Sequence, residues 1–126
     1  MLGKGILWLA AVTFTAYGLV CFFSPQTPAD FAGLALTNGD AFAEIGAMYG
    51  GLQTGFGLFC LLAATNAAYY RSGLVILVLG IGLLAVGRLY SMILAPEAVG
   101  GYTYGALVFE FFTAAVAAIA LRRGTA

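Results

Sequence analysis

The chain has no histidine and few charged side chains, which make up 8% of its 126 residues. A typical soluble domain has about 25% charged residues, so an ordinary soluble fold is excluded. The lack of histidine removes the commonest metal ligand and the commonest proton carrier at neutral pH. The formal net charge is zero and no basic cluster appears in the sequence, which argues against nucleic-acid binding. We therefore expect no metal, no cofactor and no nucleic-acid partner.

Long apolar runs are abundant instead, and hydrophobic residues make up 63% of the chain. A helix needs roughly 20 apolar residues to cross the hydrocarbon core of a membrane. Four segments reach that length, at about residues 4–23, 43–66, 73–94 and 103–121. Pro25 and Pro96 follow the first and third segments directly, where proline is a stop signal for a helix. The sequence thus predicts an all-α, integral membrane four-helix bundle, with residues 1–126 forming a single domain.

The loop charges predict the orientation of these spans. Basic residues fall at the two termini and in the second loop, at Lys4, Arg71, Arg122 and Arg123. The first and third loops carry only acidic residues, at Asp30, Asp40 and Glu97. Loops rich in Lys and Arg stay on the cytoplasmic side. We therefore expect both termini in the cytoplasm, in the inner membrane of a bacterium, with the lipid bilayer as the constant partner.

The first loop has helical features of its own. Thr27-Pro28 is a helix start and Asn38-Gly39 a helix end. Phe31 falls on the apolar face of the intervening segment, which predicts a short amphipathic helix on the outer leaflet or over the bundle. An irregular loop is the alternative. Asp40 is the expected N-cap of the second span.

The two cysteines are expected to be buried free thiols. Cys21 lies near the outer end of the first span and Cys60 towards the inner end of the second. About a dozen residues of depth separate them, roughly 18 Å at 1.5 Å per residue. A disulfide needs Cα atoms within about 7 Å, so this topology excludes an intramolecular bridge.

Ionisable residues inside the spans are the strongest functional signal. Charge at membrane depth is costly, and it usually pairs inside a bundle or marks a functional site. The predicted topology brings a set of polar side chains to a similar depth in the outer half of the bilayer: Glu44, Tyr49, Gln53, Arg88 and Glu110. Arg88 suits bidentate pairing with a carboxylate. The set is either a structural ion cluster that joins three helices or a ligand-binding site.

Glycines recur within the second span. Gly46, Gly50 and Gly57 share one face, while Gly51 and Gly55 form a separate pair. Small residues let membrane helices approach closely, so we expect these glycines to serve helix packing. The Gly50-Gly51 pair beside Tyr49 offers an alternative use, because it could open room for a lipid tail or small ligand.

The run from Glu44 to Gln53, EIGAMYGGLQ, resembles the hallmark of a family of small bacterial four-helix membrane proteins labelled a domain of unknown function. The ending Phe22-Phe23-Ser24-Pro25, Arg88 followed by Ser91, and Glu110 are also similar to that family's pattern. The resemblance covers almost the whole chain and implies a four-helix inner-membrane protein without a known activity. Members often carry arginine where this chain has Gly46, which removes one partner for the glutamates.

These features favour a non-catalytic protein that binds a lipid-like or small polar molecule through the outer-half cluster. An accessory or assembly subunit of a larger membrane complex, with a membrane-protein partner, is the first alternative. A homo-oligomeric transporter, or an enzyme acting on a lipid or quinone, is the second. The sequence offers no nucleotide loop, metal motif or paired nucleophile and base for catalysis.

Overall fold

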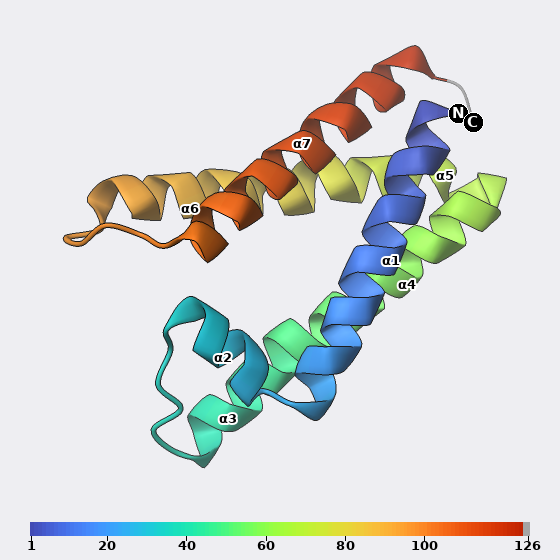
Figure 1. Cartoon of the computed structure of the whole chain (residues 1–126). Coiled ribbons are helices and arrows are strands. Elements are labelled where there is room, and N and C mark those ends of the chain that lie inside the picture. Colours follow the sequence, from blue (N-terminus) through green and yellow to red (C-terminus); the bar gives the residue numbers. More distant parts are fainter. Residues whose placement is uncertain (125–126) are drawn as a thin grey trace. The chain divides into compact units, whose positions relative to one another are not determined.

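A computed structural model of the protein describes residues 1–124 and is all-α over that range (Figure 1). Two segments within the longer helices are π-helical and carry the label η. The elements in chain order are α1 (Leu2–Phe23), α2 (Gln26–Ala32), α3 (Gly39–Ile45), η1 (Gly46–Leu52), α4 (Gln53–Thr65), α5 (Ala67–Ile76), η2 (Leu77–Ile81), α6 (Gly82–Leu94) and α7 (Gly101–Arg123).

Within residues 1–124, four continuous helices are long and apolar enough to cross a membrane, as the sequence predicts. They are Leu2–Phe23, Gly39–Thr65, Ala67–Leu94 and Gly101–Arg123. The second contains α3, η1 and α4, and the third contains α5, η2 and α6. Each is longer than the apolar core recognised in the sequence, because residues flanking that core continue the same backbone hydrogen-bond ladder.

Asparagine caps set where the second and third long helices begin. The Asn38 side chain accepts a hydrogen bond from the backbone N–H of Ala41 at 2.8 Å, and Asn66 accepts one from Ala68 at 3.0 Å. The expected cap at Asp40 is therefore wrong. Asp40 lies in the first turn of α3, where a carboxylate is favourable to the helix dipole. The expected loop after the second span is also mostly helical, since α5 starts directly after Asn66.

The connection between α1 and α3 contains α2, which is shorter than the expected helix. It begins at Gln26, ahead of Thr27-Pro28, and it ends at Gly33 rather than at Asn38-Gly39. Gly33 has φ 70°, a left-handed conformation that glycine adopts without steric cost and that ends the helix. Phe31 is exposed, at 57%. Its contact with an outer leaflet stays a prediction.

The contacts divide the chain into two compact units. The N-terminal unit comprises Trp8–Leu62, and the C-terminal unit comprises Met1–Leu7 with the chain from Ala63 onward. Each unit has its own packing.

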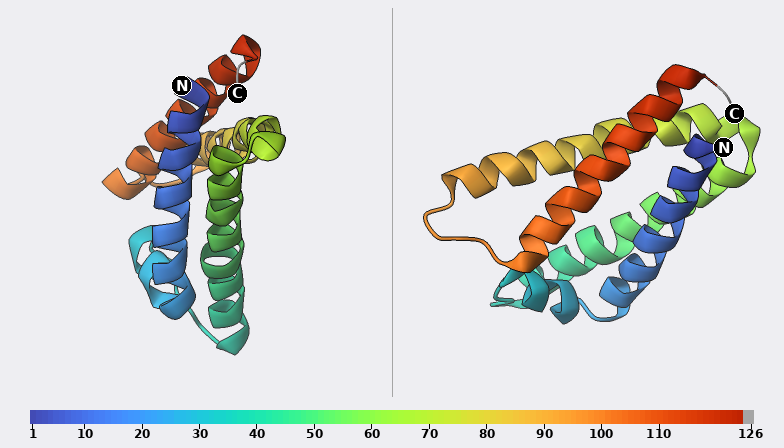
Figure 2. Two further views of the ribbon diagram at one scale, coloured as in Figure 1. Left: turned by 90° about the vertical axis from the view of Figure 1, so that its right-hand side faces the viewer. Right: turned by 45° about the horizontal axis from the view of Figure 1, so that its top comes forward.

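In the N-terminal unit, α1 lies alongside α4 with close backbone approach (Figure 2). A Cβ atom at Gly50 would lie 2.5 Å from the Cα of Phe22, and one at Gly18 would lie 2.7 Å from the backbone nitrogen of Thr54. Phe14 and Phe56 add an edge-to-face contact, with ring centroids 5.2 Å apart. Glycine is required at these positions because any side chain would displace the neighbouring backbone.

In the C-terminal unit, α7 packs along α5, η2 and α6 (Figure 1). Small or aliphatic side chains form the buried stripe on each partner. The stripe on η2 and α6 is Leu77, Ile81 and Ala85, and the stripe on α7 includes Ala117 and Ala120. The start of α1 joins this unit, since a Cβ atom at Gly3 would overlap the Tyr70 hydroxyl.

We predict that Gly57→Ala destabilises the protein and that Gly55→Ala does not. The added methyl at position 57 would lie 2.5 Å from the backbone nitrogen of Thr15, whereas one at position 55 has no neighbour within 4 Å. Overpacking costs about 1–3 kcal/mol. The control gains up to about 1 kcal/mol of helix propensity. The measurement is unfolding by titration with a denaturing detergent. Equal unfolding midpoints for the two variants would contradict the close approach of Gly57 to the backbone of Thr15.

Candidate functional site

Arg88 on α6 and Glu110 on α7 form a bidentate ion pair in the C-terminal unit. The Nη2 group of Arg88 donates to Oε1 of Glu110 at 2.7 Å. The Nε–H group donates to Oε2 at 2.9 Å and to Oε1 at 3.2 Å. One edge of the planar guanidinium thus faces the carboxylate, a geometry that gives both strength and a fixed orientation.

The two partners differ in accessibility. The side chain of Glu110 is 6% exposed, whereas that of Arg88 is 25% exposed. The carboxylate is therefore enclosed, and it is the cation of the pair that an outside molecule can reach. A charge pair among apolar helices is strengthened by the low dielectric around it, although removing both charges from water is costly.

Helical spacing explains why these residues meet. Arg88 lies three residues after Ala85, so it continues the buried stripe of η2 and α6. Glu110 begins the buried stripe of α7 that continues through Thr113 and Ala117. Residues three or four apart lie on one face of a helix. Each charge thus lies at one end of a packing face.

Thr113 adds a buried hydroxyl one turn beyond Glu110 on α7. The residue has no exposed surface, and its Oγ1 atom has no hydrogen-bond partner among the described residues. The sequence reasoning missed it, although its i+3 spacing from Glu110 is a readable signal.

The other three residues of the expected cluster lie in the N-terminal unit. Glu44 is exposed on α3, Tyr49 is half-buried in η1, and Gln53 is the first residue of α4. The Nε2 atom of Gln53 is buried and has no hydrogen-bond partner in the described chain. The structure brings Arg88 and Glu110 together, while the cluster of all five residues stays a prediction.

The glycines of the second long helix divide into two groups. A Cβ atom at Gly46 would lie 3.2 Å from the Pro25 ring, and Gly50 and Gly57 are in closer contact with α1. Gly51 and Gly55 have no neighbour within 4 Å in the described part of their unit. A packing role for that second pair stays a prediction.

The segment η1 gives this region an unusual backbone. It covers Gly46–Leu52 and contains both Tyr49 and the Gly50-Gly51 pair. Hydrogen bonds in a π-helix run from i to i+5, and such segments are frequent at functional sites. The wider spacing in η1 rotates the residues that follow it about the helix axis. The face on which they lie therefore differs from the one that regular α-helical spacing predicts.

Both cysteines, Cys21 and Cys60, are free and buried. Among the described residues, no group of three His, Cys, Asp or Glu side chains gathers in a way that could hold a metal ion. The chemistry that the C-terminal unit displays is therefore that of a partly accessible guanidinium held by an enclosed carboxylate.

Length, composition and four long apolar helices together define a small multi-pass membrane protein. The family model of the domain of unknown function DUF4345 matches residues 2–121. The chain belongs to this family, and the resemblance read from its residues is confirmed. No curated protein and no solved structure matches the chain.

We predict that breaking the pair is more costly than removing it. Arg88→Leu leaves the enclosed carboxylate without this partner, which costs about 3–5 kcal/mol. Glu110→Leu removes the partner of a partly exposed guanidinium and should cost less. The double variant Arg88→Leu/Glu110→Leu replaces both charges by apolar groups, and it should recover most of that loss. The measurement is a double-mutant cycle on unfolding in detergent. Additive losses in the double variant would contradict the coupling.

Proposed function

We propose that this protein is a non-catalytic inner-membrane protein that binds a lipid-like or small polar molecule through Arg88. The observation that carries the proposal is the unequal exposure of the ion pair. Glu110 is enclosed at 6% exposure and Arg88 is reachable at 25%. An incoming molecule therefore meets a cation whose position the carboxylate has already fixed.

The surroundings of Arg88 favour an amphiphilic ligand. Leu84, one turn before Arg88 on α6, is exposed at 45%. Ser91, also exposed, supplies a hydroxyl one turn beyond Arg88. An anionic or polar headgroup would contact the guanidinium, and its apolar part would lie along the helix surface.

We also propose ligand-binding roles for Glu44, Tyr49 and Gln53 of the N-terminal unit. Gln53 supports this role because its buried amide nitrogen is a donor that has no partner among the described residues. Buried polar atoms are usually hydrogen-bonded, and an exception calls for an explanation such as a ligand or water. Tyr49 lies one turn earlier, within the π-helical segment.

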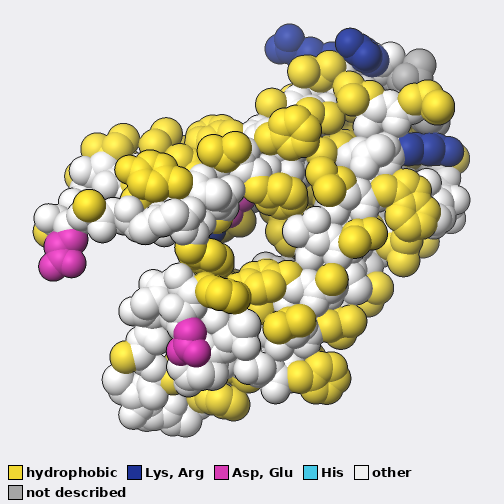
Figure 3. Space-filling view, in the orientation of Figure 1, with side chains coloured by type: hydrophobic (Ala, Val, Ile, Leu, Met, Phe, Trp, Pro, Cys, Tyr) yellow, Lys and Arg dark blue, Asp and Glu magenta, His cyan; other side chains and the backbone are white. Residues whose placement is uncertain are grey.

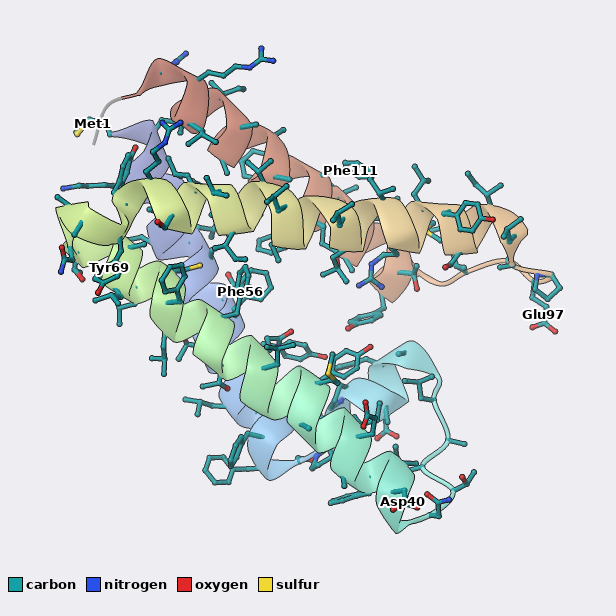
Figure 4. The ribbon with its side chains drawn as sticks, turned by 180° about the vertical axis from the view of Figure 1, so that it is seen from behind. Met1, Asp40, Phe56, Tyr69, Glu97 and Phe111 are labelled. Carbon is teal, nitrogen blue, oxygen red and sulfur yellow. The ribbon has the colours of Figure 1, made fainter. Side chains whose placement is uncertain are left out.

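We also propose that both termini face the cytoplasm of a bacterial cell. Within the C-terminal unit, Arg71 lies near the start of α5 and Arg122-Arg123 lie in the last turn of α7. Figure 4 places Glu97 at the opposite end of the α5–η2–α6 helix from Tyr69. This separation of charge supports a cytoplasmic placement of the end that carries Arg71 and Arg122-Arg123.

The binding proposal is tested by native mass spectrometry of protein extracted mildly from its own membranes. We expect the wild type to retain a small molecule and Arg88→Ala to lose it. Arg88→Lys should retain part of it, because a point charge remains while the planar fork is lost. Glu97→Gln, which changes one charge in the loop between α6 and α7, is the control.

The double variant Arg88→Leu/Glu110→Leu separates binding from folding. If it unfolds like the wild type but retains no ligand, the cation acts in binding. Retention of the same molecule by this variant would contradict the proposal. A stoichiometric protein partner in place of a small molecule would instead favour the role of an accessory subunit.

The orientation is tested by labelling single introduced cysteines in intact bacterial cells. We expect Ala98→Cys, beside Glu97, to react with a membrane-impermeant maleimide and Ser72→Cys, beside Arg71, to react only after lysis. Both positions are exposed and neither change removes a charge. The wild type sets the background, since Cys21 and Cys60 are buried. The reverse labelling pattern would overturn the proposed orientation.

A further inference from the structure

Four basic side chains lie at one end of the C-terminal unit, away from the Arg88–Glu110 pair. Lys4 is in the first turn of α1, Arg71 is near the start of α5, and Arg122-Arg123 are in the last turn of α7. All four are exposed. Figure 3 shows the dark blue of lysine and arginine at the end of α7, beyond helices covered mainly by hydrophobic side chains.

Helix packing holds these charges at a common end. The helix α7 packs along α5, η2 and α6, and its last turn, with Arg122-Arg123, lies towards the α5 end of the unit, where Arg71 is found (Figure 4). The contact of Gly3 with Tyr70 brings the start of α1 to the same part of α5. Lys4 follows Gly3 directly. Three separate helices therefore contribute cations to one region.

Acidic side chains of the unit do not balance this region. The unit contains two, Glu97 and Glu110. Glu97 lies at the opposite end of the long helix, and Glu110 is bound to Arg88. The α7 C-terminus offsets part of the charge of Arg122-Arg123 through the helix dipole. Arg71 and Lys4 lie near the starts of their helices, where the dipole is unfavourable to a cation.

We propose that this end of the C-terminal unit, here called the basic end, binds the phosphate of an anionic phospholipid. The basic end is defined by Lys4, Arg71, Arg122 and Arg123. Clusters of Lys and Arg beside membrane spans recognise anionic headgroups in this way. The proposal is independent of the ligand at Arg88, which lies roughly 26 Å from Arg71 by helical rise.

Apolar side chains beside the basic end favour a lipid over free phosphate. Leu2 is exposed at 41%, Tyr69 at 42% and Ile119 at 46%. They come from α1, α5 and α7, the same helices that supply the cations. Acyl chains can lie along these side chains while the phosphate contacts the cations, and Tyr69 suits the boundary between the two.

The experiment is a titration of the purified full chain, in a non-ionic detergent, with phosphatidylglycerol or phosphatidylcholine, with bound lipid counted by native mass spectrometry. We expect stronger retention of phosphatidylglycerol. The variant Arg71→Gln/Arg122→Gln should weaken it roughly 25-fold, about fivefold for each cation removed. Work in detergent avoids any effect of these changes on membrane insertion.

Charge-retaining and distant variants are the controls. Arg71→Lys/Arg122→Lys should retain the preference, because it keeps both charges, and Glu97→Gln should leave it unchanged. Equal retention of the two lipids by the wild type would overturn the proposal, as would unchanged retention in the glutamine variant. Displacement of the lipid by equimolar glycerol phosphate would show that free phosphate is the ligand and would also overturn it.

The outcome is distinguishable from that of the Arg88 proposal. The Arg88→Leu/Glu110→Leu variant keeps all four residues of the basic end, so it should keep the preference for phosphatidylglycerol. Loss of the preference in that variant, with its unfolding unchanged, would move the lipid site to Arg88 and overturn the basic end as a separate site.

Discussion

The ion pair between Arg88 and Glu110 determines how α6 and α7 meet. Two charges set among apolar helices must face each other, because an unpartnered charge in that environment is costly. The side-on, bidentate geometry fixes both the height at which the helices cross and the rotation of each about its axis. The small residues Ala85 and Ala117 in the adjoining stripes then allow close contact. In the same ion pair the carboxylate is enclosed and the cation is partly accessible. The interaction that joins α6 to α7 therefore also forms the candidate site.

In the N-terminal unit, close backbone packing takes the place of an ion pair. Its helix α1 lies against η1 and α4, with close backbone approach at Gly18, Gly50 and Gly57. Membrane helices gain little from apolar burial alone, because lipid tails are as apolar as the side chains. Dispersion contacts between closely spaced backbones replace that driving force. The two units thus illustrate two separate solutions, one electrostatic and one steric, to the association of helices in an apolar solvent.

The π-helical segments change how the polar residues of the long helices are presented. The segment η1 lies within the run that resembles the family's hallmark, and it carries Tyr49. The segment η2 lies in the third long helix, before Arg88; it packs against α7, and its Leu77 and Ile81 are buried. Each lengthens the hydrogen-bond spacing within an otherwise α-helical span, and so changes the rotation of everything that follows.

Apolar run length and charge position by themselves determined that the protein has four helices able to cross a membrane, and that Arg88 and Glu110 lie at a similar depth. These properties are local, since they depend on rise per residue and on the cost of charge in hydrocarbon. Helix ends were less predictable, because Asp40 and Asn38 are both good caps and the choice depends on the surrounding chain. Only the tertiary structure decided that the carboxylate is enclosed while the guanidinium is partly exposed, and that Thr113 is buried one turn beyond Glu110. Burial of a side chain depends on which residues of the neighbouring helix pack against it. The sequence of one helix does not determine those residues.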